Sequence, residues 1–216
     1  MRNWLRSLFG SEKEPALTAD LQQRIRRSFE ESASDEEHFP STIDPRILHV
    51  RVILETFGDL AGKRVLDAGC GKGRFARVLL GEYPDVRLHT MDIAVAMLRF
   101  VEAPLMPCAG SLTSLPYADG AFDCLYATES LEHAVDIERA VAELCRVVKP
   151  GGRIVVIDKN KDHWGRLETP EWERWFGEKE LAGMLGRHCR KVTSRPISYW
   201  EDVDPDGLFL VWMVER

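Results

Sequence analysis

Residues 65–75 read VLDAGCGKGRF, and this stretch decides the fold of the chain. A short apolar run leads through three glycines, Gly69, Gly71 and Gly73, into the start of a helical pattern. A strand that turns through glycines into a helix opens the ligand crevice of a doubly wound sheet. Glycine lets the backbone come close to a ligand, and the first N–H groups of a helix are free to bind an anion. The stretch therefore predicts a ligand-binding turn.

The sequence that follows this turn alternates between apolar runs and helical stretches. Strands are expected at Arg64–Ala68, Val86–Met91, Leu105–Cys108, Phe122–Ala127 and Arg153–Asp158. Helices are expected at Phe75–Glu82, Ala94–Val101, Val135–Val148 and Gly177–Arg187, and Pro150 with two glycines is expected to turn the chain into the fifth strand. Short apolar strands between helices are typical of a parallel sheet that is covered on both faces.

The end of the chain differs from this pattern. Arg190–Tyr199 and Leu208–Val214 are predicted to form an antiparallel hairpin. The prediction is a doubly wound α/β fold with a mostly parallel sheet, helices on both faces and a C-terminal antiparallel hairpin. We expect one domain over 1–216. It comprises a helical N-terminal extension or lid at 1–60, a cofactor-binding core at 61–160, and, at 161–216, a Trp-rich region for a second reactant (the acceptor) with the terminal hairpin.

Composition excludes several classes of protein. The formal net charge of -6 argues against bulk electrostatic binding of nucleic acid and leaves open a local basic patch. The five cysteines form no C-x-x-C pair, so we expect no zinc site, no disulfide framework and a reduced, cytoplasmic protein. No stretch approaches the ~20 apolar residues that span a bilayer. Residues 1–10 hold two arginines and several apolar side chains, which is weak evidence for contact with a membrane surface. The oligomeric state stays open.

An acidic residue, Asp92, ends the second predicted strand, 21 positions after Gly71. A carboxylate at this place accepts hydrogen bonds from both hydroxyls of a ribose. A dinucleotide turn, G-x-G-x-x-G, would need glycine where Arg74 stands, and a phosphate-binding P-loop is broken by Leu66 and Gly73. Two readings remain from the residues, a merely structural turn and a site for a nucleoside whose anion is a carboxylate.

Four motifs together resemble one family over residues 60–160. They are VLDAGCGKG, the strand-ending Asp92, LPYADGAFDCLYATESLEH and ELCRVVKPGGRIVV. In order and spacing they are similar to those of the class I S-adenosylmethionine-dependent methyltransferases, in the small-molecule branch described as ubiquinone-biosynthesis-like or type 11. The resemblance implies a Rossmann-like fold, S-adenosylmethionine as cofactor, S-adenosylhomocysteine as product, no metal, and a small or medium organic acceptor.

The resemblance also implies a set of cofactor-binding residues. Gly69 and Gly71 would line the methionine end, Asp92 would hold the ribose, and Ile93 and Met97 would lie against the adenine. Where the family often has an acidic residue that accepts from the adenine amine, this chain has Ser111, whose hydroxyl would make a bond weaker by roughly 1 kcal/mol. The full predicted set is Asp67, Gly69, Cys70, Gly71, Asp92, Ile93, Met97, Ser111, Leu112, Thr128 and Glu129.

Catalytic residues are harder to predict, because methyl transfer is an in-line displacement that needs a base only when the acceptor must lose a proton. His133 and His163 are the candidates for such a base, since each follows a strand at the crevice. The Trp-rich stretch at 162–176 either packs against the sheet, stabilises the sulfonium through its rings, or forms a lid with residues 1–45. A cofactor-binding module without catalysis and a nicotinamide oxidoreductase are the alternative functions.

Overall fold

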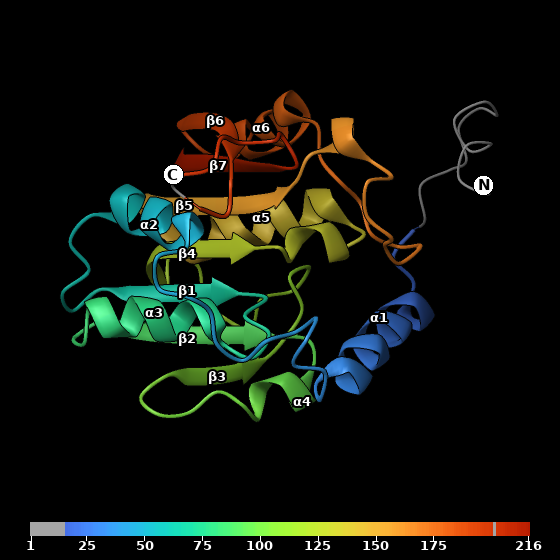
Figure 1. The fold of residues 1–216 in the computed structure, drawn as a ribbon. Coiled ribbons are helices and arrows are strands. Elements are labelled where there is room, and N and C mark those ends of the chain that lie inside the picture. The colour runs from blue at the N-terminus through green and yellow to red at the C-terminus, as the bar shows by residue number, and fades with distance from the viewer. Residues whose placement is uncertain (1–15, 201) are drawn as a thin grey trace.

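The structure, a computed structural model, describes residues 16–200 and 202–216 of the chain. Within these residues the backbone forms a seven-stranded sheet in the order β3-β2-β1-β4-β5-β7-β6 (Figure 1). The strands are β1 Arg64–Ala68, β2 Arg87–Asp92, β3 Met106–Ala109, β4 Phe122–Thr128, β5 Val148–Lys159, β6 Lys191–Ile197 and β7 Phe209–Glu215. β1 to β5 pair in parallel, and β7 lies antiparallel between β5 and β6. The predicted doubly wound fold and its terminal hairpin are confirmed.

Helices cover both faces of the sheet, and the strands show why. Side chains that alternate along β1 and β4 enter two separate cores. On one face, Leu66 and Leu125 pack with α5 (Ile137–Val147) and α6 (Glu178–Gly186). On the other face, Val65 and Tyr126 pack with α2 (Leu48–Phe57) and α3 (Arg74–Glu82). Successive side chains of a strand point to opposite faces, so a strand buried on both faces is apolar at most of its positions.

Most element boundaries lie within two residues of the sequence prediction, and two differ by more. α4 is a single turn, Val95–Leu98, and not the longer helix expected over Ala94–Val101. β5 begins at Val148, directly after α5, and takes up Pro150 and the two glycines that were expected to form a turn. The register between β4 and β5 shifts at this point. A Cβ on Gly152 would stand 2.6 Å from the Asp123 carbonyl oxygen, so the glycine lets the neighbouring strand approach closely.

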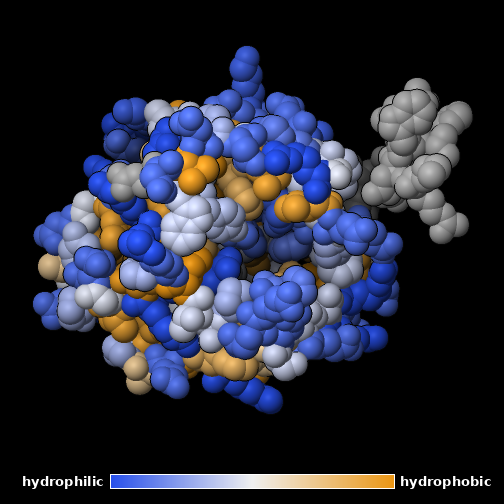
Figure 2. Space-filling model, viewed as in Figure 1, coloured by the Kyte–Doolittle hydropathy of each residue, from blue (hydrophilic) through white to orange (hydrophobic). Residues whose placement is uncertain are grey.

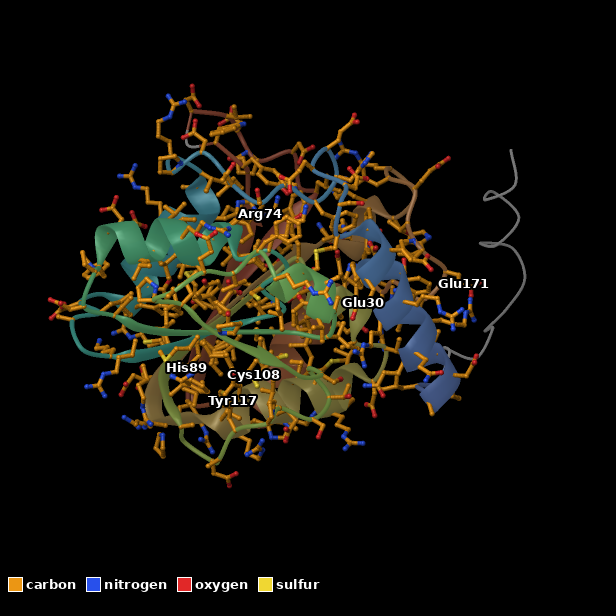
Figure 3. The ribbon with its side chains drawn as sticks, turned by 90° about the horizontal axis from the view of Figure 1, so that it is seen from below. Glu30, Arg74, His89, Cys108, Tyr117 and Glu171 are labelled. Carbon is orange, nitrogen blue, oxygen red and sulfur yellow. The ribbon has the colours of Figure 1, made fainter. Side chains whose placement is uncertain are left out.

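The N-terminal helix α1, Ala19–Ser32, lies outside the sheet and crosses the ends of its strands (Figure 1). Its Glu30 carboxylate accepts hydrogen bonds from the backbone N–H groups of Val95 and Ala96, at 2.9 and 2.7 Å, and so caps the first turn of α4 (Figure 3). Beyond α1, Glu36 pairs with the ammonium of Lys72 at 2.6 Å. These contacts fasten the helix over the carboxyl ends of the strands.

Residues 1–10, for which membrane-surface contact was predicted, lie outside the described part of the chain. Across residues 16–200 and 202–216, no helix is both long enough and apolar enough to cross a membrane.

Candidate functional site

A pocket of about 390 Å³ opens at the carboxyl ends of β1, β2 and β4, between the sheet and α1. Figure 2 shows the hollow on this face of the molecule, beside α1. The strand order reverses at β1, because β2 lies on one side of it and β4 on the other. Ligands of open α/β sheets bind at such a switch point.

The glycine turn forms one wall of this pocket. Gly69 and Gly71 have φ values of 82° and 53°, in the left-handed region that favours glycine. A Cβ on Gly69 would stand 2.4 Å from Cβ of Ser130, so Gly69 is required by packing. A Cβ on Gly71 would meet no atom of the protein within 4 Å, although Gly71 lines the pocket. The space beside Gly71 is therefore available to a ligand.

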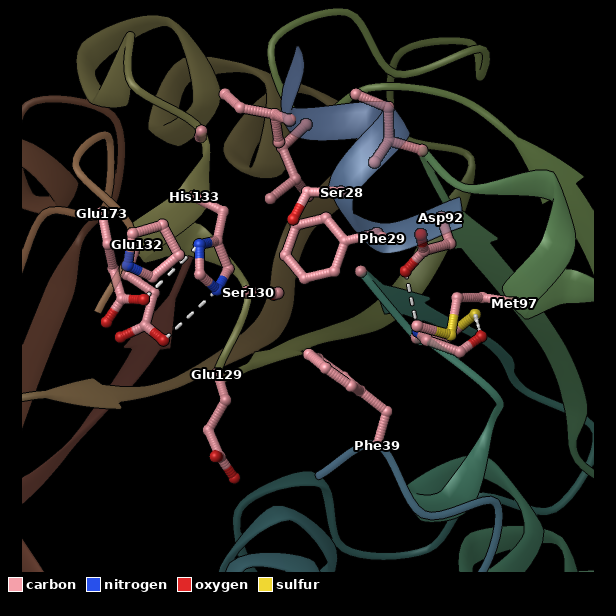
Figure 4. Close-up of a pocket in the computed structure, with 18 of the residues that line it drawn as sticks. Ser28, Phe29, Phe39, Asp92, Met97, Glu129, Ser130, Glu132, His133 and Glu173 are labelled. Carbon is pink, nitrogen blue, oxygen red and sulfur yellow. Dashed lines mark hydrogen bonds and ion pairs between the residues drawn. The ribbon is translucent and has the colours of Figure 1, made fainter. Parts of the chain in front are cut away.

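Asp92 lies next to the glycine turn, because β1 and β2 are neighbouring parallel strands. One carboxylate oxygen accepts from the Gly71 N–H at 2.8 Å and the other from the Ala94 N–H at 2.9 Å (Figure 4). Burial raises the pKa of Asp92, while these backbone hydrogen bonds act in the opposite direction. Each oxygen keeps a further lone pair, so the side chain is fixed in place and still able to accept hydrogen bonds from a ligand.

Beyond Asp92 the pocket becomes largely apolar. Ile93, Met97 and Leu112 line it together with Ser111. The hydroxyl of Ser111 lies 2.9 Å from that of Thr113 and accepts from the Thr113 N–H at 3.3 Å, so it is partly engaged within its own turn. This end of the pocket suits a flat apolar ring with polar edges.

A third group of polar residues follows β4. Glu129 has a φ of 52°, and its carboxylate accepts from Arg74 at 3.2 Å and from the Tyr199 hydroxyl at 2.8 Å. Arg74, the residue that breaks the dinucleotide motif, is thus held at the pocket wall by an ion pair. Thr128 also lines the pocket, and its buried hydroxyl has no hydrogen-bond partner.

The structure brings most of the predicted residues to the pocket but leaves two away from it. Asp67 is 1% exposed and does not line the pocket, and burial raises its pKa to about 8. Cys70 does line it, with its thiol directed to the Gly71 carbonyl at 3.4 Å. His163 lies outside the lining, with its ring against Gly207 and Nδ1 3.3 Å from Arg166. His163 therefore lies outside this pocket, and its predicted role as a base stays a prediction.

His133 lies at the end of the pocket opposite Asp92, in the 3-10 turn η2, Leu131–His133 (Figure 4). Its Nε2 is 3.6 Å from Oε1 of Glu132, and its Nδ1 is 3.8 Å from Oε2 of Glu173. Burial, together with the charge of Lys159, lowers the pKa of His133 to about 3. The imidazole is therefore neutral at physiological pH.

Lys159 joins the two carboxylates that flank His133. Its ammonium pairs with Glu132 and, at 3.0 Å, with Glu173. Burial raises the pKa of Glu132 to about 7, because the charged form loses its water. Glu132, His133 and Glu173 are also spaced like the ligands of a metal ion, but the ammonium of Lys159 already supplies a cation to both carboxylates.

Several lining residues were not predicted as site residues. Phe29 and Phe39 come from α1 and the loop after it, and Lys72 is 3% exposed within the glycine turn. Glu173 comes from the Trp-rich stretch, where no spacing distinguishes it from its neighbours. Of the tryptophans there, Trp172 lines the pocket, whereas Trp175 is 2% exposed and packs edge to face with Trp164. Packing thus accounts for part of the Trp-rich stretch, and Trp172 belongs to the site.

Comparison with known proteins gives consistent matches. Residues 66–156 match the family model described as a methyltransferase domain. The chain is 32% identical over 147 residues to a malonyl-[acyl-carrier protein] O-methyltransferase of Dechloromonas aromatica, a match that covers 67% of this chain and 53% of that protein. It is 32% identical over 155 residues to a demethylmenaquinone methyltransferase of Renibacterium salmoninarum, a match that covers 69% of this chain and 61% of that protein. The chain thus spans about half the length of the curated relatives that it matches.

A solved structure extends the likeness of the fold. Geranyl diphosphate C-methyltransferase from Streptomyces coelicolor A3(2), crystallised with Mg²⁺, geranyl diphosphate and S-adenosyl-L-homocysteine, superposes with a TM-score of 0.67 at 15% identity. The superposition covers 94% of this chain and all of the other. At this identity the match supports the shared fold.

Proposed function

Because residues 66–156 match a methyltransferase-domain model, we propose that this chain is a class I S-adenosylmethionine-dependent methyltransferase that transfers a methyl group from S-adenosylmethionine to a small or medium organic acceptor. The observation that carries the proposal is Asp92, fixed by two backbone hydrogen bonds beside the open space at Gly71. When bound, S-adenosylmethionine supplies an activated methyl group on its sulfonium.

The residues present fit this cofactor. Asp92 would accept the two ribose hydroxyls, Ile93 and Met97 would pack against the adenine, and Ser111 would face its polar edge. The Arg74–Glu129 pair offers a cation and an anion to the amino-acid end of the ligand, and the unpartnered hydroxyl of Thr128 is a further polar contact. Asp67, buried behind the turn, would act by holding the turn in place.

We also propose that the N-terminal segment acts as a lid. Phe29 of α1 and Phe39 enter the pocket, and the Glu30 and Glu36 contacts hold this segment against α4 and the glycine turn. A cover of this kind excludes water from the reacting centre and aligns donor with acceptor. The neutral His133 would contribute a hydrogen-bond acceptor, since a pKa of about 3 makes it too weak a base to take a proton at neutral pH.

Titration calorimetry with S-adenosylmethionine and S-adenosylhomocysteine tests the proposal. Asp92→Ala leaves two ribose hydroxyls without an acceptor, so we expect a loss of about 1–3 kcal/mol, or roughly 5- to 150-fold in affinity. Asp119→Ala, which removes a carboxylate whose side chain is 79% exposed, is the matched control. Unchanged affinity in Asp92→Ala, or no binding to the folded parent, would contradict the proposed site. Binding without turnover across a broad acceptor panel would favour a non-catalytic module.

A further inference from the structure

The end of the pocket around His133 combines an apolar slot with a polar wall. Phe29 packs edge to face on the His133 ring, with centroids 5.0 Å apart, and Phe39 packs edge to face on Phe29 at 6.0 Å. Ile25 and Trp172 line the same space. Figure 4 shows Phe29 between the Asp92 end and the Glu132–His133 end. Aromatic and branched side chains arranged around a slot suit a flat apolar molecule.

The polar wall of this slot holds acceptor atoms with spare capacity for a ligand. Nδ1 of His133 is buried without a hydrogen-bond partner, and the Glu132 carboxylate, on a residue that is 1% exposed, is bonded to Lys159 and to the buried Asp158 carboxyl and keeps further lone pairs. Buried polar groups are nearly always paired, because an unpaired one has lost its hydrogen bonds to water without replacing them. The indole N–H of Trp172 is also buried and unpartnered. A ligand group that both donates and accepts would satisfy these atoms.

Positive charge in the pocket is already committed to protein carboxylates. Within the described residues, the lysines and arginine that line the pocket are Lys72, Arg74 and Lys159, and each forms an ion pair. Lys72 pairs with Glu36, and Arg74 pairs with Glu129. Lys159 pairs with both Glu132 and Glu173. A carboxylate or phosphate on the acceptor would meet Glu132 and Glu173 at the polar wall without a free cation to pair with. An anionic acceptor is therefore disfavoured.

We propose that the acceptor is a neutral, flat apolar molecule whose hydroxyl group donates a hydrogen bond to Glu132 or His133, an inference that rests on the proposed function. A hydroxyl oxygen can also accept from Trp172, which a protonated amine cannot do. During transfer the acceptor oxygen forms its bond to the methyl carbon while the sulfur–carbon bond breaks, the electron pair of that bond stays on sulfur, and the hydroxyl proton passes to the Glu132 carboxylate. Asp92 and Glu132 thus serve opposite ends of one pocket.

The test compares two probes of the same shape, 2-naphthol and 2-naphthoic acid, by titration calorimetry at pH 7.5 on the full chain loaded with S-adenosylhomocysteine. We expect naphthol to bind at least about tenfold more tightly, which corresponds to about 1.4 kcal/mol. Glu132→Gln replaces the charge with an amide that can donate to a carboxylate, and we expect it to remove most of this preference. Glu82→Gln, which alters an exposed carboxylate at the end of α3, should keep it.

Three outcomes overturn the inference. The first is that naphthoate binds as tightly as naphthol, and the second is that neither probe binds. The third is that Glu132→Gln, shown to be folded by a thermal melt, keeps the parent's preference for naphthol. If Glu132→Gln does not fold, the comparison of the two probes on the parent protein still decides. Failure of S-adenosylhomocysteine itself to bind would instead refute the proposed function, so the two failures are distinguishable.

Discussion

Replacement of Gly71 by alanine, compared with the same replacement at Gly62, separates the energetic cost of a left-handed backbone from the loss of space for a ligand. Gly71 and Gly62 have similar positive φ values, 53° and 67°, and a Cβ on either would meet no protein atom within 4 Å. They differ in place, because Gly71 lines the pocket and Gly62 precedes β1. Gly62→Ala is therefore a matched control for the backbone.

The expected magnitudes follow from this geometry. Each alanine should lower the free energy of unfolding by about 1–2 kcal/mol, the cost of a left-handed non-glycine residue. Gly71→Ala should also place a methyl group in the cofactor space, and overpacking of that kind costs about 1–3 kcal/mol. The affinity for S-adenosylhomocysteine should then fall roughly 5- to 150-fold in Gly71→Ala and stay at the parent value in Gly62→Ala.

Urea unfolding and titration calorimetry on the two variants measure the two quantities separately. Gly69→Ala extends the series, since its Cβ would stand 2.4 Å from Cβ of Ser130 and should destabilise the fold more than Gly62→Ala does. Parent-like affinity in Gly71→Ala, or an equal loss of affinity in both variants, would refute the assignment of this space to the cofactor.

Two further predictions concern pH. Partial burial alone would raise the pKa of Glu30, but hydrogen bonds from the α4 backbone outweigh it and lower the pKa below 4.5. The contribution of Glu30 to the free energy of unfolding is therefore full above pH 4.5 and is lost as the pH falls through the folded-state pKa. Glu30→Gln should lower the free energy of unfolding by about 1 kcal/mol and speed amide exchange at Val95 and Ala96, and unchanged exchange would count against the cap. Burial lowers the pKa of His49, which stacks on Tyr199, from 6.5 to about 4. As the pH falls, the unfolded chain is protonated at this residue before the folded chain is, so the free energy of unfolding should fall by about 3 kcal/mol between pH 6.5 and 4. Urea unfolding of His49→Phe should show a smaller pH dependence over this range, and an equal dependence in both proteins would contradict the prediction.

The sequence alone determined the parallel core, the glycine turn and the place of Asp92. These features depend on local periodicity and on neighbouring strands, since parallel pairing of β1 with β2 brings Asp92, at the end of β2, beside the glycine turn that follows β1. Element ends were less predictable. α4 is shorter than its apolar pattern, and β5 includes the residues of the expected turn, where Gly152 lets β4 approach closely.

Only the tertiary structure decided what the polar residues do. His163 follows β5 in sequence, yet the chain turns away there, because the Asn160 side chain bonds to the Gly207 carbonyl and His163 packs on Gly207. Glu173, by contrast, reaches Lys159 and the vicinity of His133 from a segment with no recognisable motif. The protonation states of Glu132 and His133 arise from burial, and burial is a property of packing between distant segments that periodicity along the chain does not record.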